Sequence, residues 1–527
     1  MKGFFKVINI ILLVIIIFLV GFLVGKKYDF ALDDNKDIIG LQYSDNEQKI
    51  RRLVSLIDNE YVNEVNSDSL VDDAINYMVG KLDPHSTYIN KASVQQAEEQ
   101  IKGEFVGIGI QFRTLNDTII VERTIPGTSN TGKLQFGDQV ISVDNQSLIA
   151  KDNKTIETLL KGKKGSEVNL SVIRDKKLIA IKLKRTIVPI ATVTGEHMLT
   201  KDMGYIKLTR FSENSVSEVH QALDNLVGRG MKTLVFDLRG NGGGIMRVAE
   251  EIADEFLTKD ELIVYTQDKS KKKKYIYATN YGLFEKGKVY VLIDESSASS
   301  SEIVAGALQD YGRGTIVGRR SFGKGLVQRE INLGDNTRVR LTVANYFTPS
   351  GRSIQKPYDK GTAKYSDDLY ERLKSGELYN KDSIKVNKNL EYTAPSGKKV
   401  YGGGGIIPDE FVALDTNSVA NWLYYNQDAN YFNDFLFKKI YSIHDFFMFH
   451  NEKTYLRYFS AGMYREEFLG VLGIPAKEFN PIYSTTVDNY MKAVIAEDLY
   501  GSRAFYEIWS PEDEMIKRIF ELENKTK

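Results

Sequence analysis

The sequence predicts a multidomain α/β (α+β) protein with one long apolar segment near its N-terminus. Between residues 200 and 350, strand-like segments alternate with amphipathic helical ones, as in an α/β core. Residues 103–188 instead carry short β-branched runs separated by glycine, and residues from about 415 onward are helical and aromatic. A chain of 527 residues is also too long for a single hydrophobic core.

The apolar segment has the length of a membrane-spanning helix. From Val7 to Gly25 the chain carries no charge, and nineteen residues at about 1.5 Å each span roughly the hydrocarbon thickness of a bilayer. A cleaved signal peptide is the alternative, but this stretch is longer than a usual signal core and no small-x-small cleavage motif follows it. We therefore expect residues 1–27 to be an uncleaved anchor that crosses the membrane through residues 7–25. Lysines flank both ends, so charge alone does not decide the topology.

Downstream we expect a linker and a helical segment, residues 28–102. Residues 28–45 are polar, and residues 46–101 show helical apolar spacing that is broken by a turn at Leu82-Asp-Pro-His85. The next unit, residues 103–188, is predicted to be a small β-rich domain. Its expected strands lie at 118–121, 139–143 and 168–173.

The α/β core is expected to cover residues 189–410. Its expected elements are strands at 205–208, 233–238, 289–293 and 338–343, and helices at 216–227, at 245–256 and from residue 302. Within it, a lysine run at 271–274 is interpreted as a solvated turn between strand-like segments. Residues 352–408 are turn-rich and polar. Residues 411–527 are predicted to form a helical C-terminal domain, whose aromatic residues are interpreted as core.

Composition excludes several function classes. Lys+Arg and Asp+Glu both number 70, so the formal net charge is zero and long-range attraction to nucleic acid is not expected. The chain has no cysteine. Disulfides, thiolate nucleophiles and thiolate metal ligands are therefore excluded, as is a lipid-bearing N-terminal cysteine.

Three segments of the core carry residues suited to catalysis. Asp237–Gly244 is a glycine-rich turn between a strand and a helix, where successive N–H groups can hold an anion. Ser296–Glu302 is a serine-rich turn that also joins a strand to a helix, and Phe322–Gln328 places a lysine between two glycines. Each segment alone has a structural explanation. These are a tight turn, a capping box formed by Ser299 with the glutamate at the third helical position, and a lysine in solvent.

Together the segments can supply a nucleophile, a base and an oxyanion site. Ser299 lies at a predicted helix start, and Lys324 can act as its base only when neutral. The ordinary lysine pKa of about 10.4 must then fall by about 2–3 units through burial or neighbouring positive charge. If residues 324–328 are extended, Gln328 shares a face with Lys324, and its amide oxygen can accept a hydrogen bond from the lysine.

Other chemistries fit the sequence less well. Gly318-x-x-x-x-Gly323-Lys324 matches most of a phosphate-binding loop, but Gly325 replaces the serine or threonine that binds magnesium, and a strand-like segment follows. The glycine turn also lacks the dinucleotide-binding spacing. None of the five histidines is tied to Ser299 by the sequence, and no histidine pair has zinc-ligand spacing. We therefore expect neither a metal nor an organic cofactor.

In this order the motifs resemble the carboxy-terminal processing peptidases, also called tail-specific proteases. The resemblance runs over most of residues 46–410. It is carried by Leu82-Asp-Pro-His-Ser-Thr-Tyr88, the Asp-Leu-Arg glycine turn, Ser297-Ala-Ser-Ser-Ser-Glu-Ile303 and Phe322-Gly-Lys-Gly-Leu-Val-Gln328. It implies a serine–lysine peptidase core at 189–410 and a PDZ domain at 103–188.

The resemblance also implies roles for single residues. Ser299 is the expected nucleophile, Lys324 the general base and Gln328 the residue that positions the lysine. Ser297 and Ser301 are the alternative nucleophiles. The expected oxyanion donors are the backbone N–H groups of Gly243 or Gly244 and of Ser300.

In the PDZ-like region, Phe105-Val-Gly-Ile-Gly-Ile110 resembles the loop that holds the terminal carboxylate of a peptide. The expected peptide-binding residues are Val106, Gly107, Ile108, Gly109 and Ile110. Such a domain adds its ligand as an extra strand at a sheet edge. The fragment 126–133 is less typical of the family, so the approach to the pocket is expected to differ.

The resemblance implies a serine endopeptidase that cleaves near the C-terminal tails of unfolded or membrane-associated extracytoplasmic proteins. It further implies a single-pass protein of the bacterial inner membrane, with its catalytic part in the periplasm or an equivalent space. A second copy of the chain is a candidate partner, whereas nucleic acid is not. The alternative is a catalytically silent, membrane-anchored PDZ scaffold that binds tails without cutting them.

Overall fold

The structure is a computed structural model. It describes residues 44–128, 130–359, 361–414, 419, 423, 430–443, 452–475, 477 and 479–526. The expected anchor at Val7–Gly25 lies outside these residues. Among the described residues, no helix combines the length and the apolar character needed to cross a bilayer. The chain divides into two compact units, of which the smaller contains residues up to Leu82, Ser86–Val94 and Glu330–Leu341.

The described residues of the smaller unit form helices α2 and α3 and strand β1, together with the start of α4 and the adjoining ends of β17 and β18. Helix α2 (Asp45–Glu60) starts with a capping box between Ser44 and Glu47, and helix α3 (Ser67–Gly80) follows it. Strand β1 (Thr87–Ile89) pairs antiparallel with the start of β18, so that Ile89 lies opposite Arg338. The sequence predicted only helices here. Thr87-Tyr88-Ile89 instead forms a strand because β-branched and aromatic side chains suit a paired, half-buried surface.

Helix α4 (Lys91–Lys102), whose residues from Gln95 onward belong to the larger unit, leads into a β-rich domain, as predicted. Its five-stranded path runs β3-β4-β5-β7-β8, and β3 is an edge strand. Three of its hairpins turn through pairs of residues with positive φ, such as Asn116-Asp117. The elements are β2 (Glu104–Gly107), β3 (Ile110–Leu115), β4 (Thr118–Thr124), β5 (Gln139–Val143), β6 (Gln146–Ser147), α5 (Asn153–Leu160), β7 (Glu167–Arg174), β8 (Lys177–Lys184) and β9 (Thr186–Pro189).

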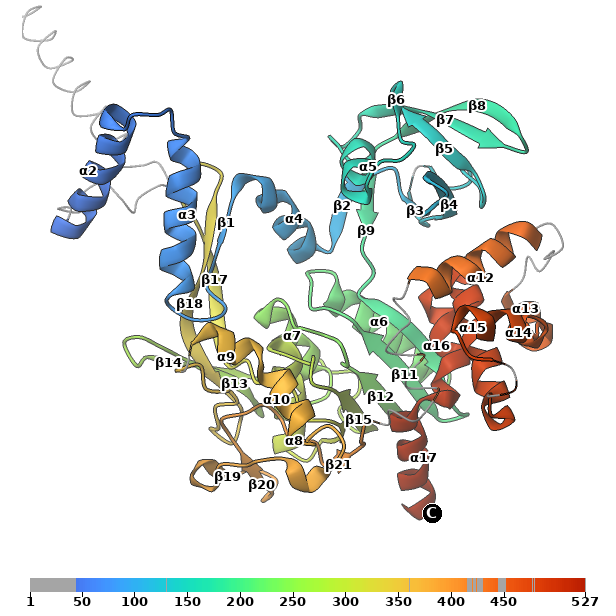
Figure 1. Ribbon diagram of the computed structural model, residues 1–527. Coiled ribbons are helices and arrows are strands. Elements are labelled where there is room, and N and C mark those ends of the chain that lie inside the picture. Colours follow the sequence, from blue (N-terminus) through green and yellow to red (C-terminus); the bar gives the residue numbers. More distant parts are fainter. Residues whose placement is uncertain are drawn as a thin grey trace, which may run out of the picture. The chain divides into compact units, whose positions relative to one another are not determined.

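The α/β core is built on a six-stranded sheet, ordered β10-β11-β12-β15-β16-β21 (Figure 1). Strands β10 and β11 are antiparallel, and the remaining neighbours are parallel. The strands are β10 (Val193–Met198), β11 (Met203–Leu208), β12 (Thr233–Asp237), β15 (Lys288–Ile293), β16 (Gly314–Gly318) and β21 (Glu410–Phe411). The connecting helices are α6 (Ser215–Gly228), α7 (Met246–Asp254) and α8 (Ser300–Asp310).

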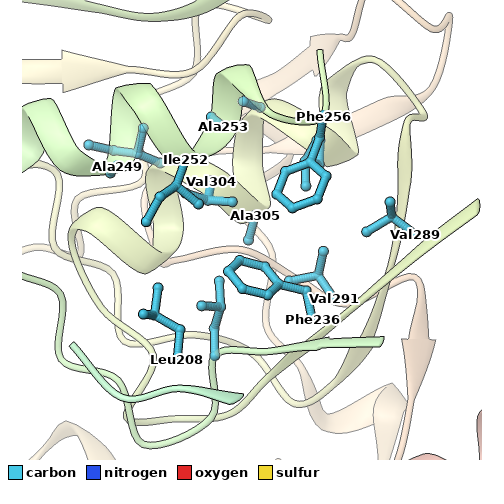
Figure 2. Close-up of a cluster of buried hydrophobic side chains, with 14 of the residues drawn as sticks. Leu208, Phe236, Ala249, Ile252, Ala253, Phe256, Val289, Val291, Val304 and Ala305 are labelled. Carbon is cyan, nitrogen blue, oxygen red and sulfur yellow. The ribbon is translucent and has the colours of Figure 1, made fainter. Parts of the chain in front are cut away.

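Both faces of this sheet are buried, as expected for parallel strands. On one face Phe236 and Val291 pack against Ile252 of α7 and Val304 of α8 (Figure 2). The other face is covered by helix α17 (Glu514–Thr526). Its cluster comprises Tyr205, Val235, Tyr290, Leu292 and Val317 with Met515, Ile516 and Ile519. Thus α17 packs on the core sheet, although the sequence places it in the C-terminal domain.

A second sheet contains the predicted lysine hairpin. It is ordered β1-β18-β13-β14, with β17 beside β18. Strands β13 (Leu262–Asp268) and β14 (Lys273–Tyr277) flank the turn, and β17 (Leu326–Asn332) and β18 (Arg338–Phe347) follow later in the chain. Residues 352–408, expected to be only turn-rich, also contain short elements that lack a readable apolar period. These are α9 (Thr362–Ser366), α10 (Asp368–Lys374), two 3-10 turns (Lys381–Ser383 and Lys388–Leu390), β19 (Glu391–Thr393) and β20 (Lys399–Tyr401).

The C-terminal region is helical, as predicted, and its buried aromatic residues form a core of their own. Tyr455, Phe468, Tyr490 and Trp509 are all buried in it. The helices are α12 (Asn430–Ile443), α13 (Glu452–Tyr458), α14 (Arg465–Val471), α15 (Ser484–Tyr500) and α16 (Ser502–Trp509), with 3-10 turns at Ala461–Tyr464, Pro481–Tyr483 and Ser510–Glu512.

These helices also contact the β-rich domain. Arg113 of β3 lies 4.9 Å from the ring centre of Phe437 and 3.4 Å from the Asp498 carboxylate. The same guanidinium forms a 2.7 Å ion pair with Glu122 of β4. Tyr441 accepts a 2.9 Å hydrogen bond from the side chain of Gln139. Arg113 of the β-rich domain therefore contacts both an aromatic ring and the buried carboxyl group of Asp498 in the helical region.

Candidate active site

Ser299 stands at the junction between β15 and α8, as the sequence predicts. Its φ of 56° and ψ of −111° place a residue with a side chain in a sparsely populated backbone region. Such a conformation persists only where the surrounding structure enforces it, and it is concentrated at functional sites. Ser299 is half-buried and starts a helix whose eleven residues are all buried.

The other serines of this segment have hydroxyl groups engaged in packing the turn. Ser297 donates to the Leu238 carbonyl at 2.9 Å, and Ser301 donates to the Asn241 carbonyl at 2.8 Å. Both side chains are fully buried. These two alternative nucleophiles are therefore built into the interior, where a substrate carbonyl cannot reach them.

The carboxylate of Glu302 joins the nucleophile segment to the lysine segment. One oxygen, Oε2, accepts hydrogen bonds from the N–H groups of Ser299 at 2.8 Å and of Lys324 at 2.9 Å. The other, Oε1, accepts from the Gly323 N–H at 2.7 Å and from the Ser321 hydroxyl at 2.6 Å. Burial raises the pKa of Glu302, and these donors oppose that rise. The predicted capping glutamate thus also fixes the position of the lysine loop.

Tyr346 of β18 links the same two segments. Its hydroxyl lies 2.8 Å from the Lys324 carbonyl and 3.1 Å from the Ser299 carbonyl. The ring is buried, and burial holds the pKa of this phenol well above its ordinary value. The hydroxyl therefore remains a hydrogen-bond donor at every physiological pH.

Lys324 lines a cavity of about 460 Å³ that Ala298, the neighbour of Ser299, also lines. Gly242 of the glycine turn lines it as well, and its other lining residues include His85, Phe322 and two further cations. Burial and the nearby charge of Lys324 lower the pKa of His85 to about 4. His85 is therefore neutral near pH 7 and is a very weak base, and its Nε2 lies 2.7 Å from the Tyr365 hydroxyl.

The two further cations in this cavity are Lys356 and Arg372. Lys356 Nζ lies 3.8 Å from the ring centre of Phe322 and 3.1 Å from the Asp368 carboxylate. Burial lowers the pKa of both cations, although each also has Asp368 as an ion-pair partner. The cavity that Lys324 lines therefore holds two further cations together with the carboxylates of Asp368 and Glu295.

Gln328 lies on β17, two positions after the strand begins. Its amide N–H donates to the Thr342 hydroxyl on the neighbouring β18 at 3.2 Å. This bond fixes the side chain, and the amide oxygen is the atom that the sequence assigns to the lysine. Residues 324 and 325 precede the strand, so only part of the expected extended segment 324–328 is regular β structure.

The glycine turn passes directly against Ser299. A Cβ atom at Gly243 would lie 2.8 Å from the Ser299 Cβ and 3.0 Å from the Ser300 nitrogen, so only glycine allows this approach. The Gly243 N–H donates to the Asn241 side chain at 2.9 Å. For Gly243 to serve as an oxyanion donor, that hydrogen bond must be shared or exchanged. The N–H groups of Gly244 and Ser300 donate to no partner within the described part of the chain.

A second groove, of about 520 Å³, lies in the β-rich domain between edge strand β3 and helix α5. Four of the five predicted peptide-binding residues line it: Gly107, Ile108, Gly109 and Ile110. Val106 does not line it, although its neighbours Phe105 and Gly107 do, because successive residues of strand β2 face opposite sides. The unusual fragment 126–133 contributes Asn130, which is fully buried and donates to the Ile108 carbonyl at 3.0 Å. Asn130 therefore stabilises the loop by a hydrogen bond to its backbone.

Comparison with known proteins identifies the family. The model of peptidase family S41 matches residues 202–363, the PDZ domain model matches residues 106–184, and the model of the activating protease CtpB N-terminal domain matches residues 29–93. The chain is 34% identical to the carboxy-terminal processing protease CtpB of Bacillus subtilis over 352 residues, covering 65% of this chain and 72% of that protein. The chain belongs to the carboxy-terminal processing protease family. It is therefore a serine-type peptidase with a PDZ domain.

Further members of the family are similar to this chain over comparable lengths. The carboxy-terminal-processing protease of Bartonella bacilliformis is 37% identical over 306 residues, which cover 56% of this chain and 69% of the relative. Among solved structures, the photosystem II D1 C-terminal processing protease aligns at 25% identity over 61% of this chain and 86% of its own, with a TM-score of 0.35.

Several residues of this processing protease escaped the sequence analysis. Glu302 was assigned only a capping role, and no sequence pattern indicated that Tyr346 or Thr342 lies at the site. The Leu82-Asp-Pro-His motif was the one available signal for His85.

No group of three or more His, Asp or Glu side chains is arranged to bind a metal within the described residues.

Proposed function

We propose that Ser299 is the nucleophile and Lys324 the general base of this processing protease. Ser299 Oγ attacks the scissile carbonyl and gives its proton to Lys324. The N–H groups of Ser300 and Gly244 stabilise the resulting oxyanion. Lys324 then protonates the departing amine, and a water molecule activated by the same lysine hydrolyses the acyl-enzyme.

The single observation that carries this proposal is the shared carboxylate of Glu302. It accepts a hydrogen bond from the backbone of Ser299 and another from the backbone of Lys324 through the same oxygen atom. The two residues are thereby held together although 25 positions separate them. Lys356 and Arg372 line the same cavity as Lys324, together with Asp368, with which both form ion pairs.

The test is cleavage of an unfolded protein with an apolar C-terminal tail by the full chain in detergent. Ser299→Ala and Lys324→Ala are each expected to lower kcat by at least about 1,000-fold while the proteins stay folded. Ser217→Ala and Lys259→Ala are matched controls, because both side chains are exposed and distant in sequence from the site. An inert wild type, or a Ser299→Ala variant that cuts normally, would refute the assignment and leave the tail-binding scaffold as the function.

We further propose that the PDZ groove selects the substrate by its free C-terminus. Strand β3 offers an unpaired edge, and the loop Ile108-Gly109 reaches the groove with its backbone. The same substrate with an amidated C-terminus tests this without altering the enzyme. We expect the amide to raise KM by about 10-fold or more. Equal KM values for the acid and the amide would show that the terminal carboxylate is not read.

We also propose that the protein is anchored by residues 7–25 with its catalytic part outside the cytoplasm, in a bacterial membrane. The uncharged run of nineteen residues and the substrate class support this. Protease added to intact spheroplasts should then digest the PDZ and peptidase domains, and removal of residues 1–27 should release the protein from the membrane fraction. Protection in intact spheroplasts would indicate the opposite topology.

A homo-oligomer is the remaining proposal, with a second copy of the chain covering α2. This helix has no buried residue, and its apolar side chains Ile50, Leu53 and Leu56 are about half exposed. Light scattering of the full chain in detergent should give a mass above one copy, and Leu53→Glu with Leu56→Glu should reduce it to one. A wild type that is already monomeric contradicts this interface.

A further inference from the structure

Arg239 connects the root of the glycine turn to the start of helix α17. Its Nη2 lies 2.6 Å from one oxygen of Asp237, at the end of β12, and its Nη1 lies 2.7 Å from the Asp513 carboxylate. Asp513 precedes α17, where its other oxygen accepts from the N–H groups of Met515 at 2.9 Å and Ile516 at 3.2 Å. One carboxylate therefore caps a helix and holds a guanidinium at the same time.

The cluster is buried and its charges balance. Arg239 is 6% exposed, Asp237 is not exposed at all and Asp513 is 8% exposed at its side chain. Lys207, also buried, lies 3.2 Å from Asp237 and completes a set of two cations and two carboxylates. Burial alone would raise the pKa of Asp237, but Arg239 and Lys207 outweigh it and hold that pKa well below its ordinary value.

From this cluster the chain passes directly into the glycine turn. Lys207 donates to the Arg239 carbonyl at 2.5 Å, and the next N–H, that of Gly240, lies about equally far from both oxygens of Asp294 at 3.0 and 3.1 Å. Asn241 follows, fully buried, and fixes Gly243. Hydrogen bonds therefore hold the backbone of the turn from Arg239 onward. A shift in the position of Arg239 would consequently displace Gly243 and Gly244.

We propose that Asp513 is a positioning residue for catalysis, which acts through Arg239 on the oxyanion turn. This inference rests on the proposed serine–lysine mechanism. Asp513 lies in the helical region beyond the matched peptidase segment, and it is separated from Arg239 by 274 positions. If Asp513 loses its charge, the buried cluster retains two cations, Arg239 and Lys207, but only one carboxylate. The guanidinium of Arg239 then has Asp237 as its one remaining ion-pair partner in the cluster.

The effect should fall on the transition state. Oxyanion donors contribute most when the tetrahedral intermediate forms, so a displaced turn lowers kcat and leaves substrate binding nearly unchanged. A purely structural Asp513 would instead change the unfolding temperature with no change in kcat well below that temperature. The split between kcat and KM therefore separates positioning from simple stabilisation.

Asp513→Asn is the decisive variant, because asparagine caps a helix about as well as aspartate but has no charge for Arg239. In the full chain we expect kcat to fall by about 10- to 100-fold, with KM within about twofold of wild type. Glu514→Gln is the matched control. It lies one residue further on, is partly exposed, and forms its ion pair with Lys517 within the helix.

Two further variants complete the test. Arg239→Gln should lower kcat similarly, and the double variant Arg239→Gln with Asp513→Asn should be no slower than the slower single variant, because both act through one contact. Asp513→Glu keeps the charge and should recover most of the lost rate. If Asp513→Asn does not fold, Arg239→Lys decides. Lysine cannot bridge two carboxylates as a planar guanidinium does, so kcat should fall at unchanged KM.

The outcomes are distinguishable from those of the proposed mechanism. Full activity in Ser299→Ala, or an inert wild type, overturns the mechanism itself. An inert Ser299→Ala together with an unchanged kcat in Asp513→Asn overturns only the role of Asp513. Equal loss of rate in Asp513→Asn and Asp513→Glu, with both folded, also contradicts positioning through charge, as does a double variant whose losses simply add.

Discussion

Gly243 illustrates how one residue can be essential without a side chain. Its φ of 97° is costly for other residues, and the space beside it is occupied by Ser299. Two separate penalties therefore act on any substitution. One is backbone strain, and the other is the loss of close contact between the turn and Ser299.

Gly243→Ala separates these penalties when it is compared with Gly230→Ala. Gly230 has a φ of 92° but open space around its Cβ position. We expect Gly230→Ala to lower the free energy of unfolding by about 1 kcal/mol with little change in kcat. Gly243→Ala should lower kcat by at least about 100-fold, because the added methyl displaces Ser299 or the turn. Thermal unfolding and steady-state kinetics measure both quantities, and a fully active Gly243→Ala contradicts the close approach.

Substitution of Thr342 tests whether Gln328 positions Lys324, by removing a single hydrogen bond. Thr342→Val keeps the shape of the side chain but removes the hydroxyl that accepts from Gln328. If Gln328 positions Lys324, its freed amide should lower kcat by about 3- to 10-fold at constant KM, as expected for loss of one hydrogen bond. In a Gln328→Ala background the Thr342→Val change should then have no further effect on kcat. A further decrease in that background would show that Thr342 acts by another route.

At the scale of elements, α17 serves as the second covering layer of the core sheet. Ile519 and Ile516 are buried against strand residues such as Val235 and Leu292. Parallel strands carry apolar side chains on both faces, so a sheet covered only by α6, α7 and α8 would leave one face in water. The helix therefore belongs energetically to the peptidase core.

Ile519→Ala tests this assignment. Truncation of a buried isoleucine leaves a cavity, so we expect the free energy of unfolding to fall by about 2–5 kcal/mol. Val227→Ala is the control, because Val227 is 42% exposed at the end of α6 and should change stability by less than about 0.5 kcal/mol. Denaturant titration with tryptophan or circular dichroism detection measures both. An Ile519→Ala variant as stable as Val227→Ala would place α17 outside the cooperative core.

Element-level features were predictable where the signal is local. The strand β5 at 139–143 matches its prediction, because β-branched residues and flanking turns mark it. The helix starting near Ser299 was equally readable from its capping pattern. The short helices α9 and α10 and the strand β1 were missed, since a few residues carry too little periodicity. Contacts such as Glu302 with Lys324 were out of reach, because they depend on how the chain folds back on itself.

At the scale of the whole molecule, the helical C-terminal region contacts both the PDZ domain and the core sheet. Its least expected feature is the buried carboxyl of Asp498. Burial raises the pKa of Asp498 to about 8, with Arg113 opposing the rise and Glu122 and Glu497 adding to it. The carboxyl of Asp434 also faces the same guanidinium at 3.7 Å. The contact between the two domains therefore carries a carboxyl that favours its proton at neutral pH.

This predicts a specific pH dependence of stability. In the unfolded chain Asp498 ionises near pH 4, while in the folded protein it keeps its proton to about pH 8. A pKa raised by folding means that this contribution to stability is complete below about pH 4 and is lost as the pH rises toward 8. The Tm should therefore fall by several degrees between about pH 5 and 8 relative to Asp498→Asn, in which the group cannot ionise.

The comparison with the variant is needed because other groups titrate in the opposite sense. Burial lowers the pKa of His197 to about 3, so its contribution is lost as the pH falls below about 6.5. The difference between wild type and Asp498→Asn cancels that contribution. Asp224→Asn, an exposed carboxyl of α6, serves as the control and should follow wild type at every pH. Parallel curves for wild type and Asp498→Asn would contradict the raised pKa.

The packing of α17 also has a consequence for biosynthesis. Ser299 and Lys324 emerge from the ribosome long before residues 514–526, so the nascent chain contains both proposed catalytic residues before the helix that covers one face of its central sheet. Because domains fold as units once their layers are complete, the core is expected to mature only when α17 has been made. A chain that ends before α17 would then lack a complete core and would not cleave other proteins. Proteolytic activity would begin only after α17 has been synthesised and has packed on the sheet.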